Sequence, residues 1–532
     1  MRRFLRAVSL AGLSSVMLVA GNPASAQKPG GILRVYLTAS PPNMSMLELP
    51  TIVGEMPMMG VFNNLIMFDQ HVPQVSLQSI VPDLATDWSW SEEGTELTFK
   101  LHHGVKWHDG KPFTAADVKC TWDLMADKAT DKLRLNPRKS SYDNLEAVTP
   151  NGDYEVTFRL KRPQPAFPML LAGGFSVIYP CHVSAGQMRQ HPIGTGPFKF
   201  VEFKPNESIK VTRNPDYWKP ERPYLDGIEY TIVADPSTAK LAFESGKFDL
   251  TLPYDLTVPV FNDVRSQMPQ AICELSPGIT PRHLLVNRDK PPFDNADLRR
   301  AMALSIDRAA FIDILSQGQG EIGGVLEPPP GGLWGMPPDQ ITTLPGYDPD
   351  VQKNRDQARQ IMQKFGYGPD KPLNIKVTTR DWFVYRDPAV LLIDQLKHVY
   401  IDGELELIDT AQYFPKILRK DFTVALNLQT SGPDPDPILK LFYGCGSSSP
   451  NSGGYCNPEV DKMIEAQSRE GDPDRRKQIL WAIERKLAED NARPIIFYNR
   501  TGTCEQPYVK GLTIMVNSIF NGWRMEDVWL DK

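Results

Sequence analysis

Residues 273–308 read CELSPGITPRHLLVNRDKPPFDNADLRRAMALSIDR, and this stretch decides how the 532-residue chain is divided. A turn-rich opening around Pro277 and Pro281 is followed by the apolar run 284–286, and two prolines at 291–292 precede a long helical pattern. A fresh strand and helix after a half-polar, turn-rich region indicate that the chain leaves one lobe and enters another.

A second candidate crossing lies at residues 494–504, where the apolar run 495–498 leads into a short polar tail. If the chain leaves the first lobe at one crossing and returns at the other, the lobes share a hinge of two segments. A chain of this length supports more than one hydrophobic core. We therefore expect the functional site in a cleft between two lobes.

The first 26 residues have the pattern of a secretory signal peptide. Arg2, Arg3 and Arg6 form a basic start, residues 7–20 are apolar, and Ala24-Ser25-Ala26 predicts cleavage after Ala26. No other stretch is long and apolar enough to span a bilayer, so we expect a soluble, exported protein. Without this segment 55 basic residues stand against 64 acidic ones, a balance that speaks against nucleic acid as a partner.

All six cysteines follow the signal peptide, so they reach a compartment where disulfides persist. Cys445 and Cys456 bracket a polar loop, and Cys273 and Cys504 lie one at each proposed crossing. We expect these two pairs to be bonded, although spacing alone leaves fifteen connectivities open. The cysteines at 120 and 181 are left without an assigned partner. A zinc site or a catalytic thiol is the alternative, but no CxxC spacing or companion histidine supports it.

Hydrophobic periodicity predicts a mixed α+β first part and an α/β second part, and hence an α/β fold class overall. Residues 97–101 and 156–160 alternate as half-buried strands do, and Thr114 with Asp117 forms a capping box that opens a helix. Further strands are expected at 32–37, 373–379, 404–409 and 422–428, and helices at 53–67, 236–245, 295–315, 352–365, 388–399, 458–469 and 473–489.

Motifs for catalysis are missing from the sequence. It contains no GxSxG, HExxH, SxxK or Walker loop. His102 and His103 would point to opposite faces of a strand, so no metal site is expected there. Asp434 and Asp436 stand in a proline-rich loop, where loop structure and ligand contact are both open readings. We expect no enzyme and no cofactor.

Several segments occur together in a characteristic order. They are DLATDWSWSEEGTELTFKLHHGVKWHDGKPFTAADVKCTWD from residue 83, GTGPFKF from 194, RNPDYW from 213, PYLDGI from 223, VNRDKPPFDNADLRRAMALSIDR from 286 and GYCNPEVDKMI from 454. This ordered set resembles the dipeptide/oligopeptide/nickel class of ABC-transporter solute-binding proteins, family 5, over nearly all of the chain from residue 30 onward.

The resemblance implies a two-lobed periplasmic binding protein with an additional subdomain on the first lobe and a hinge of two crossing segments. Lobe I would comprise 27–277 with 500–532, including the subdomain 61–195, and lobe II would comprise 278–499. Such a receptor captures a peptide or peptide-like small polar solute by hinge closure and delivers it to an ABC permease complex in the inner membrane. We expect a monomer. The segment 107–110, WHDG, is then a fold marker that pins a turn.

The resemblance also points to ligand-binding residues. Peptide-binding relatives hold the ligand's amino terminus with an Asp of the second lobe. The comparable segment here contains Thr430, Asp434 and Asp436 but lacks the Trp and the Asp-Tyr pair of the relatives. Asp434 is therefore a candidate by position. A charge buried there without a partner would demand a cationic group on the ligand.

A carboxylate-binding arginine is expected near the end of strand 373–379. Arg380 is the candidate, because a guanidinium fork suits a carboxylate or phosphate. The alternative is that Arg380 pairs with Asp381 or a neighbouring acid on the surface. Trp382 and Tyr385 would line the same wall. From the first lobe, Thr38 and Ser40 follow the first strand and are expected to reach the cleft.

Three alternatives to transport remain at this point. The same fold serves as a ligand sensor or peptide chaperone that passes its cargo to a receptor. An exported hydrolase would use the 434–436 loop. A nickel or haem cargo fits the family, although no compact histidine set supports it.

Overall fold

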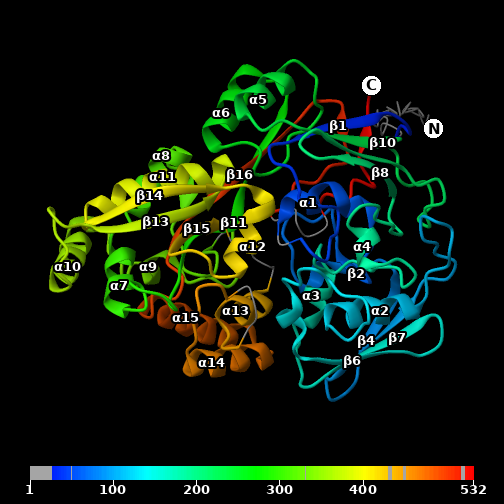
Figure 1. Ribbon diagram of the computed structural model, residues 1–532. Coiled ribbons are helices and arrows are strands. Elements are labelled where there is room, and N and C mark those ends of the chain that lie inside the picture. The colour runs from blue at the N-terminus through cyan, green and yellow to red at the C-terminus, as the bar shows by residue number, and fades with distance from the viewer. Residues whose placement is uncertain (1–26, 50, 330, 429–433, 447–450, 517–521) are drawn as a thin grey trace, which may run out of the picture.

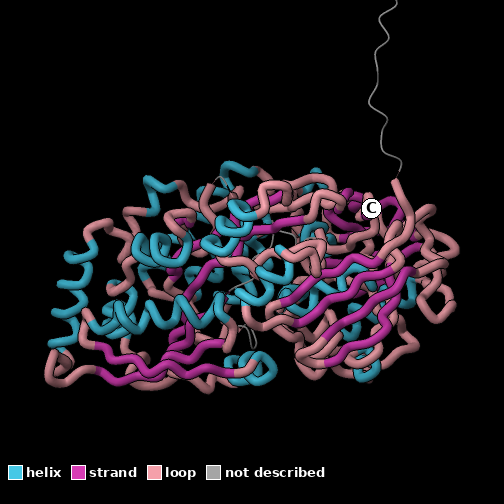
Figure 2. The backbone as a smooth tube through the Cα atoms, turned by 90° about the horizontal axis from the view of Figure 1, so that it is seen from above, coloured by secondary structure: helices cyan, strands magenta, loops and turns pink. Residues whose placement is uncertain are grey.

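The computed structural model describes residues 27–49, 51–329, 331–428, 434–446, 451–516 and 522–532. It has two lobes that lie side by side, with both described chain ends in the first (Figure 1). Viewed from above, the strands form separate groups in the two lobes, with helices packed around those of the second (Figure 2). The expected two-lobed α/β architecture is confirmed.

The first lobe is built on a four-stranded sheet. Its order is β1 (Ile32–Leu37), β10 (Gly227–Ile232), β9 (Ser208–Arg213) and β8 (Phe198–Lys204). β1 pairs in parallel with β10, and the other neighbours are antiparallel. Two short strand pairs, β2 (Ile66–Phe68) with β3 (Ile80–Pro82) and β17 (Val509–Lys510) with β18 (Trp529–Leu530), complete its strands. Its helices are α1 (Ile52–Met58), α3 (Phe167–Ala172), α4 (Ala185–Met188), α5 (Pro236–Glu244) and α6 (Val258–Gln267).

A subdomain extends the first lobe at the lower right of Figure 1. Its antiparallel sheet has the order β4 (Ala85–Trp90), β5 (Glu96–Leu101), β7 (Glu155–Leu160) and β6 (Leu145–Pro150). Helix α2 (Ala115–Met125) begins at the predicted capping box, where Thr114 and Asp117 bond each other's backbone. The ring of His108 bonds Gly194 and Gly196, so the WHDG turn ties the subdomain to the chain that leaves it.

The second lobe is built on a six-stranded sheet. Its order is β12 (Gly320–Glu321), β16 (Ile495–Glu505), β11 (Ile272–Val286), β15 (Val424–Leu428), β13 (Leu373–Arg380) and β14 (Ile401–Ile408). β13 runs parallel to both of its neighbours, so its carboxyl end meets theirs at one edge. The helices are α7 (Ala296–Leu304), α8 (Arg308–Ser316), α9 (Pro338–Ile341), α10 (Val351–Lys364), α11 (Phe383–Lys397), α12 (Thr410–Leu418), α13 (Pro435–Tyr443), α14 (Pro458–Arg469) and α15 (Pro473–Glu489).

Two long strands, β11 and β16, connect the lobes. They pair from Ile272 opposite Glu505 to Pro277 opposite Arg500, lose register, and resume at Pro281 opposite Tyr498. In the gap, a β-carbon on residue 278 would lie 2.2 Å from the Asn499 carbonyl oxygen, so the close approach of the strands requires glycine. The irregularity lies at the expected crossings. The residue limits proposed for the lobes and subdomain stay a prediction.

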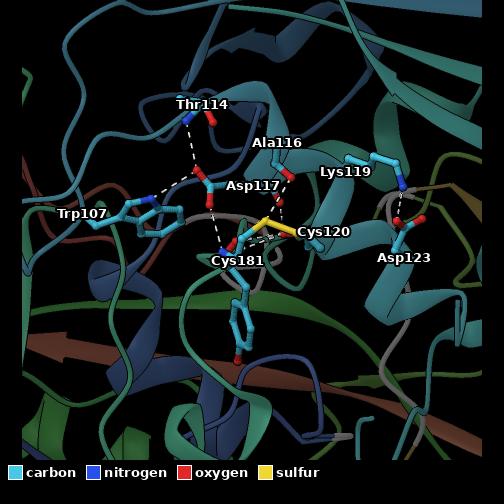
Figure 3. The surroundings of a disulfide bond; sticks show 10 residues. Trp107, Thr114, Ala116, Asp117, Lys119, Cys120, Asp123 and Cys181 are labelled. Carbon is cyan, nitrogen blue, oxygen red and sulfur yellow. Dashed lines mark hydrogen bonds and ion pairs between the residues drawn. A yellow bond between two sulfur atoms is a disulfide. The ribbon is translucent and has the colours of Figure 1, made fainter. Parts of the chain in front are cut away.

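Three disulfides are present. Cys273–Cys504 joins β11 to β16, and Cys445–Cys456 closes the short loop, as expected for these pairs. The two remaining cysteines, Cys120 of α2 and Cys181, form the third (Figure 3). Beside this bond, both oxygens of Asp117 are used, one by the Cys181 backbone N–H and the other by the Trp107 indole. The third disulfide therefore links the segment around Cys181, where the chain leaves the subdomain, to helix α2.

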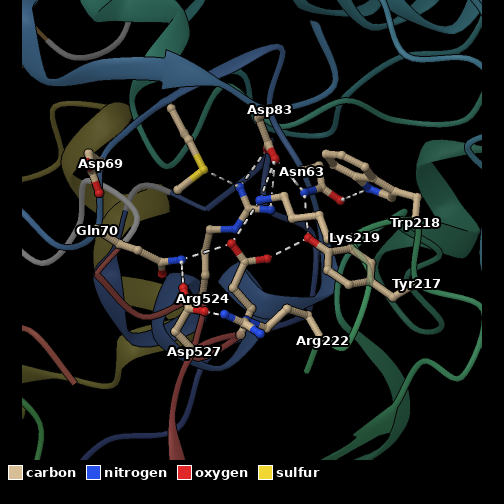
Figure 4. Close-up of polar contacts among 12 residues, drawn as sticks. Asn63, Asp69, Gln70, Asp83, Tyr217, Trp218, Lys219, Arg222, Arg524 and Asp527 are labelled. Carbon is tan, nitrogen blue, oxygen red and sulfur yellow. Dashed lines mark hydrogen bonds and ion pairs between the residues drawn. The ribbon is translucent and has the colours of Figure 1, made fainter. Parts of the chain in front are cut away.

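The C-terminal segment is buried in the first lobe through a cluster of charges (Figure 4). Arg524 donates to Asp83 at 2.6 Å, and both side chains are almost fully buried. Glu526 accepts from Tyr217 at 2.6 Å and from Lys219 at 2.8 Å. The last residues of the chain are thus part of the first-lobe core.

Several predicted elements differ in extent. The helix expected at 295–315 is interrupted at 305–307, where Asp307 caps α8 anew. The helix expected from 388 begins at Phe383 and contains Pro388. The helix expected at 53–67 ends as α1 at Met58 and is followed by the 3-10 turn Met59–Val61 and by β2. Among the described residues no helix has the length and apolar character needed to cross a membrane.

Candidate functional site

The lobes touch through side chains at the carboxyl end of β13. The indole Nε1 of Trp382 donates to the Thr38 hydroxyl of the first lobe at 3.0 Å. The guanidinium Nη1 of Arg380 lies 3.5 Å from the hydroxyl of Thr51, which caps α1. We call the region around Thr38, Thr51, Arg380, Trp382 and Tyr385 the lobe interface.

Arg380 is the fully buried cation of the lobe interface. Its Nε donates to Thr410 at the start of α12 at 2.8 Å, whereas Nη2 has no hydrogen-bond partner among the described residues. Burial lowers the pKa of the guanidinium, and the nearby Tyr385, Tyr413 and Asp409 act in the opposite direction. Among the described residues no carboxylate forms an ion pair with it, so the alternative of a surface pair with Asp381 or a neighbouring acid is not formed. A buried, unpaired guanidinium suits an anionic group from outside the chain.

Aromatic rings surround this guanidinium. Its carbon lies 4.7 Å from the Trp382 ring centroid, 5.4 Å from that of Tyr385 and 5.8 Å from that of Phe414. Trp382 and Tyr385 lie against each other at 5.8 Å. Rings at these distances stabilise a cation in a desolvated place and leave its N–H edge for hydrogen bonding. Trp382 and Tyr385 therefore lie on one wall with Arg380, as the sequence predicted for them.

The first lobe contributes Thr38, which directly follows β1. Its hydroxyl donates to Asp255 at 2.6 Å while it accepts from Trp382, and its N–H bonds the same Asp255 oxygen. Burial raises the pKa of Asp255 to about 7, against the lowering effect of the two Thr38 bonds. Ser40 instead accepts from the Asn206 N–H within the first lobe, 3.1 Å away, so it is held away from the contacts that join the lobes.

Glu55 is a second buried acid of the first lobe. It lies on α1, four residues after Thr51, and neither of its carboxylate oxygens has a hydrogen-bond partner among the described residues. Burial raises its pKa well above the ordinary value, and the charge of Arg138 only partly opposes this. Among the described residues, no hydrogen bond or ion pair joins the Glu55 carboxyl to Arg380.

Asp434 and Asp436 are placed differently from a free ligand anchor. Both oxygens of Asp434 bond Arg476, at 2.6 and 2.7 Å, and one also caps α13 through the Asp436 N–H. Asp436 accepts from Gln467 and, at 2.5 Å, from Gln164 of the subdomain. A ligand role for either acid stays a prediction that these contacts do not favour, because their oxygens already have partners.

Thr430, the remaining predicted residue, lies outside the described residues.

Sequence reasoning missed several residues of this region. Thr51 and Gln164 carry no local signal, because each is defined only by its partner in the other lobe. Arg282 did carry a local signal, because it is a charged residue inside the apolar end of β11. In the structure it is 3% exposed. A charge in an otherwise apolar strand is a buried polar group that needs an explanation. Among the described residues, no group of three or more His, Cys, Asp or Glu side chains is placed to hold a metal ion.

Comparison with known proteins agrees with this architecture. The family model for bacterial extracellular solute-binding proteins, family 5 (middle), matches residues 79–450. The di/tripeptide-binding protein 1 of Pseudomonas aeruginosa is 26% identical over 468 residues, which cover 81% of this chain and 81% of the relative.

Two solved structures share the fold. The oligopeptide-binding protein AppA of Bacillus subtilis, in complex with a nonapeptide, superposes with a TM-score of 0.83 at 22% identity, over 95% of this chain and 100% of that one. The periplasmic binding protein DppA of Helicobacter pylori, in complex with the peptide STSA, gives a TM-score of 0.81 at 21% identity, over 95% and 99%.

Proposed function

The chain belongs to the bacterial extracellular solute-binding proteins of family 5, and from this premise we propose that it is the periplasmic receptor of an ABC importer for a short peptide or peptide-like acid. Its solute-binding role follows from the family. The peptide nature of the solute and the permease partner are the proposal, and the names of the similar proteins support both.

One observation carries the choice of ligand chemistry. Arg380 is fully buried at the lobe interface, and among the described residues it has no ion-pair partner and its Nη2 has no hydrogen-bond partner. Leaving a cation in such a place costs several kcal/mol unless an anion pairs with it. A ligand carboxylate on Arg380 supplies this anion, and the rings of Trp382 and Tyr385 exclude water around the pair.

Binding by hinge closure follows from the position of these residues. Arg380 and Trp382 belong to the second lobe, and their partners Thr51 and Thr38 belong to the first. A ligand that contacts both sides favours the closed arrangement by its differential affinity for it. The irregular pairing between Pro277 and Pro281 is the proposed pivot, which supports lobe limits of 27–277 with 500–532 and of 278–499.

Export and the mode of action complete the proposal. Removal of residues 1–26 and release into the periplasm agree with the three disulfides, which persist in oxidising compartments. The receptor acts as a monomer, binds its solute without a reaction, and presents the closed form to the permease. The family consists of binding proteins, which supports the absence of catalysis.

The test combines identification of the cargo with a matched pair of variants. Native mass spectrometry of protein purified from its own periplasm is expected to show a bound acidic peptide or peptide-like solute. Calorimetric titration of that solute is expected to show at least a tenfold loss for Arg380→Gln. The exposed Arg386→Gln, on the helix that follows, is expected to leave affinity unchanged. Unchanged affinity in Arg380→Gln, with the fold intact by circular dichroism, would contradict the proposal.

A further inference from the structure

A second buried arginine lies on a hinge strand. Arg282 of β11 is 3% exposed, and its Nε and Nη1 have no hydrogen-bond partner among the described residues. Its guanidinium carbon lies 5.2 Å from the Phe497 ring centroid of β16. Burial lowers the pKa of Arg282 to about 10, a value at which it remains charged at neutral pH. The hinge thus contains an unneutralised cation.

Arg282 lines a small cavity, the hinge pocket, which residues of both lobes form. Tyr254 and Leu256 come from the first lobe, Phe383 and Val384 from the second, and Phe497 from β16. Its volume is about 40 Å³, partly open to solvent. At roughly 10–15 Å³ for each water, this holds a few waters or one carboxyl-sized group. The pocket therefore fits one end of a ligand and not a whole one.

None of the described acids forms an ion pair with Arg282 or Arg380, and Asp409 favours the charge of Arg380 only from a distance. The residues outside the described ranges include no Asp or Glu, and among the described acids none forms an ion pair with either arginine. Asp387, which also lines the hinge pocket, pairs with Arg386 and is 45% exposed. A buried guanidinium left in this state requires an external anion, as Arg380 does.

Arg380 and Arg282 both affect the pKa of the Tyr385 hydroxyl. Burial raises the pKa of Tyr385, while the charges of Arg380 and Arg282 both lower it, so both cations lie within electrostatic reach of this hydroxyl. Two buried acids are only partly ionised at neutral pH, so they offset only part of this positive charge. Burial raises the pKa of Glu327 to about 8 and that of Asp255 to about 7. The described part of the lobe interface and hinge pocket therefore has two cationic positions.

We propose that Arg282 binds a second acidic group of the ligand in the hinge pocket, so that the receptor selects solutes with two carboxylates. This rests on the proposed function, because Arg380 holds the first acidic group. A diacid pairs both guanidinium groups on closure, whereas a monoacid leaves Arg282 buried and unpaired. The expected discrimination is at least tenfold in dissociation constant, since a buried charged pair with one partner missing is strongly penalised.

The test uses two pairs of probes that differ only by an amide in place of a carboxylate. Ala-Glu and Ala-Gln are titrated calorimetrically, and so are glutarate and its half-amide. Wild-type protein is expected to bind each diacid at least tenfold tighter than its half-amide. Arg282→Gln is expected to remove this ratio, and Arg282→Lys is expected to retain part of it. The exposed Arg300→Gln serves as the control and is expected to keep the wild-type ratio.

The two pairs separate this inference from the proposed function. If glutarate is preferred over its half-amide in an Arg282-dependent way while neither dipeptide binds, the diacid inference holds and the peptide assignment fails. If dipeptides bind but Ala-Glu and Ala-Gln bind equally, the peptide assignment holds and the diacid inference is overturned. A ratio that survives in a folded Arg282→Gln protein also overturns it, as does the absence of any diacid binding at millimolar concentration.

Discussion

The ion pair between Asp434 and Arg476 offers a direct test of whether Asp434 is structural. The pair is bidentate, with N–O distances of 2.6 and 2.7 Å and side-chain exposures of 2% and 8%. Arg476 also donates to Gln467 and lies over the Trp334 ring at 4.6 Å. Burial alone would lower the pKa of Arg476, but the charge and hydrogen bonds of Asp434, together with the charge of Asp436, outweigh this and raise it.

Replacing Arg476 by Met leaves Asp434 as a buried charge with only its helix cap. Breaking a buried pair on one side costs about 3–5 kcal/mol. For a cooperative unit of about 150–250 residues, each kcal/mol lowers the melting temperature by roughly 2–4 °C. Asp434→Asn keeps the cap, because Asn caps helices as well as Asp does, but it leaves Arg476 without its counter-charge. Asp434→Asn should therefore lower the free energy of unfolding by a similar amount.

The double variant Asp434→Asn with Arg476→Met leaves neither charge unpaired. Its loss should therefore fall below the sum of the single losses by about 2 kcal/mol or more. Urea unfolding followed by circular dichroism measures this coupling. Asp472→Asn, at the exposed cap of α15, is the control and should change stability by less than about 0.5 kcal/mol.

Ligand affinity separates the structural role of Asp434 from the binding role suggested by the family. If the only role of Asp434 is to stabilise the second lobe, the folded Asp434→Asn protein should bind its solute with unchanged affinity. A loss of more than tenfold in affinity at unchanged stability would refute the reasoning, as would additive losses in the double variant.

Three further predictions concern other contacts. Trp382→Phe removes the indole hydrogen bond to Thr38. Because one hydrogen bond contributes about 1 kcal/mol, solute affinity measured by calorimetry should fall about fivefold. Unchanged affinity would show that the bond does not favour closure. Burial alone would raise the pKa of Glu526, but nearby cations lower this pKa from its ordinary 4.5 to about 2. The ionised Glu526 carboxylate therefore stabilises the fold by about 3 kcal/mol above pH 4.5, and this contribution is lost as the pH falls toward 2. Glu526→Gln should therefore show a smaller loss of urea stability between pH 7 and pH 3 than wild type, and an equal loss would contradict the assigned shift. Cys273→Ser with Cys504→Ser opens a loop of 231 residues and should lower the free energy of unfolding by roughly 5 kcal/mol on the chain-entropy scale; a change below about 1 kcal/mol would contradict it.

The sequence predicted local elements well wherever the signal was local. Helices α14 and α15 begin at the predicted residues, because an Asn or Asp cap followed by proline defines a first turn within two positions. The break between α7 and α8 was missed, since the apolar periodicity continues through residues 305–307. In the loop before α9, Trp334 packs against a hydrophobic cluster, whereas Leu333 is 45% exposed.

The position of a candidate site residue was predictable where it depends on one strand end and unpredictable where it depends on distant partners; ligand binding by these residues stays a prediction. Arg380 lies at the carboxyl end of a parallel strand, a position that a sequence pattern identifies. The partner of Asp434 lies 42 residues away on another helix, and only the fold reveals that the carboxylate is already used. The same holds for Ser40, which the β8–β9 turn engages through Asn206.

The burial of Arg524 against Asp83 has a consequence for biosynthesis. These residues are 441 positions apart, so part of the first-lobe core forms only after the second lobe has been synthesised. Domains that are continuous in sequence begin to fold as they emerge from the ribosome. The first lobe is discontinuous in sequence, so this part of its core cannot close until the chain has been synthesised through Arg524.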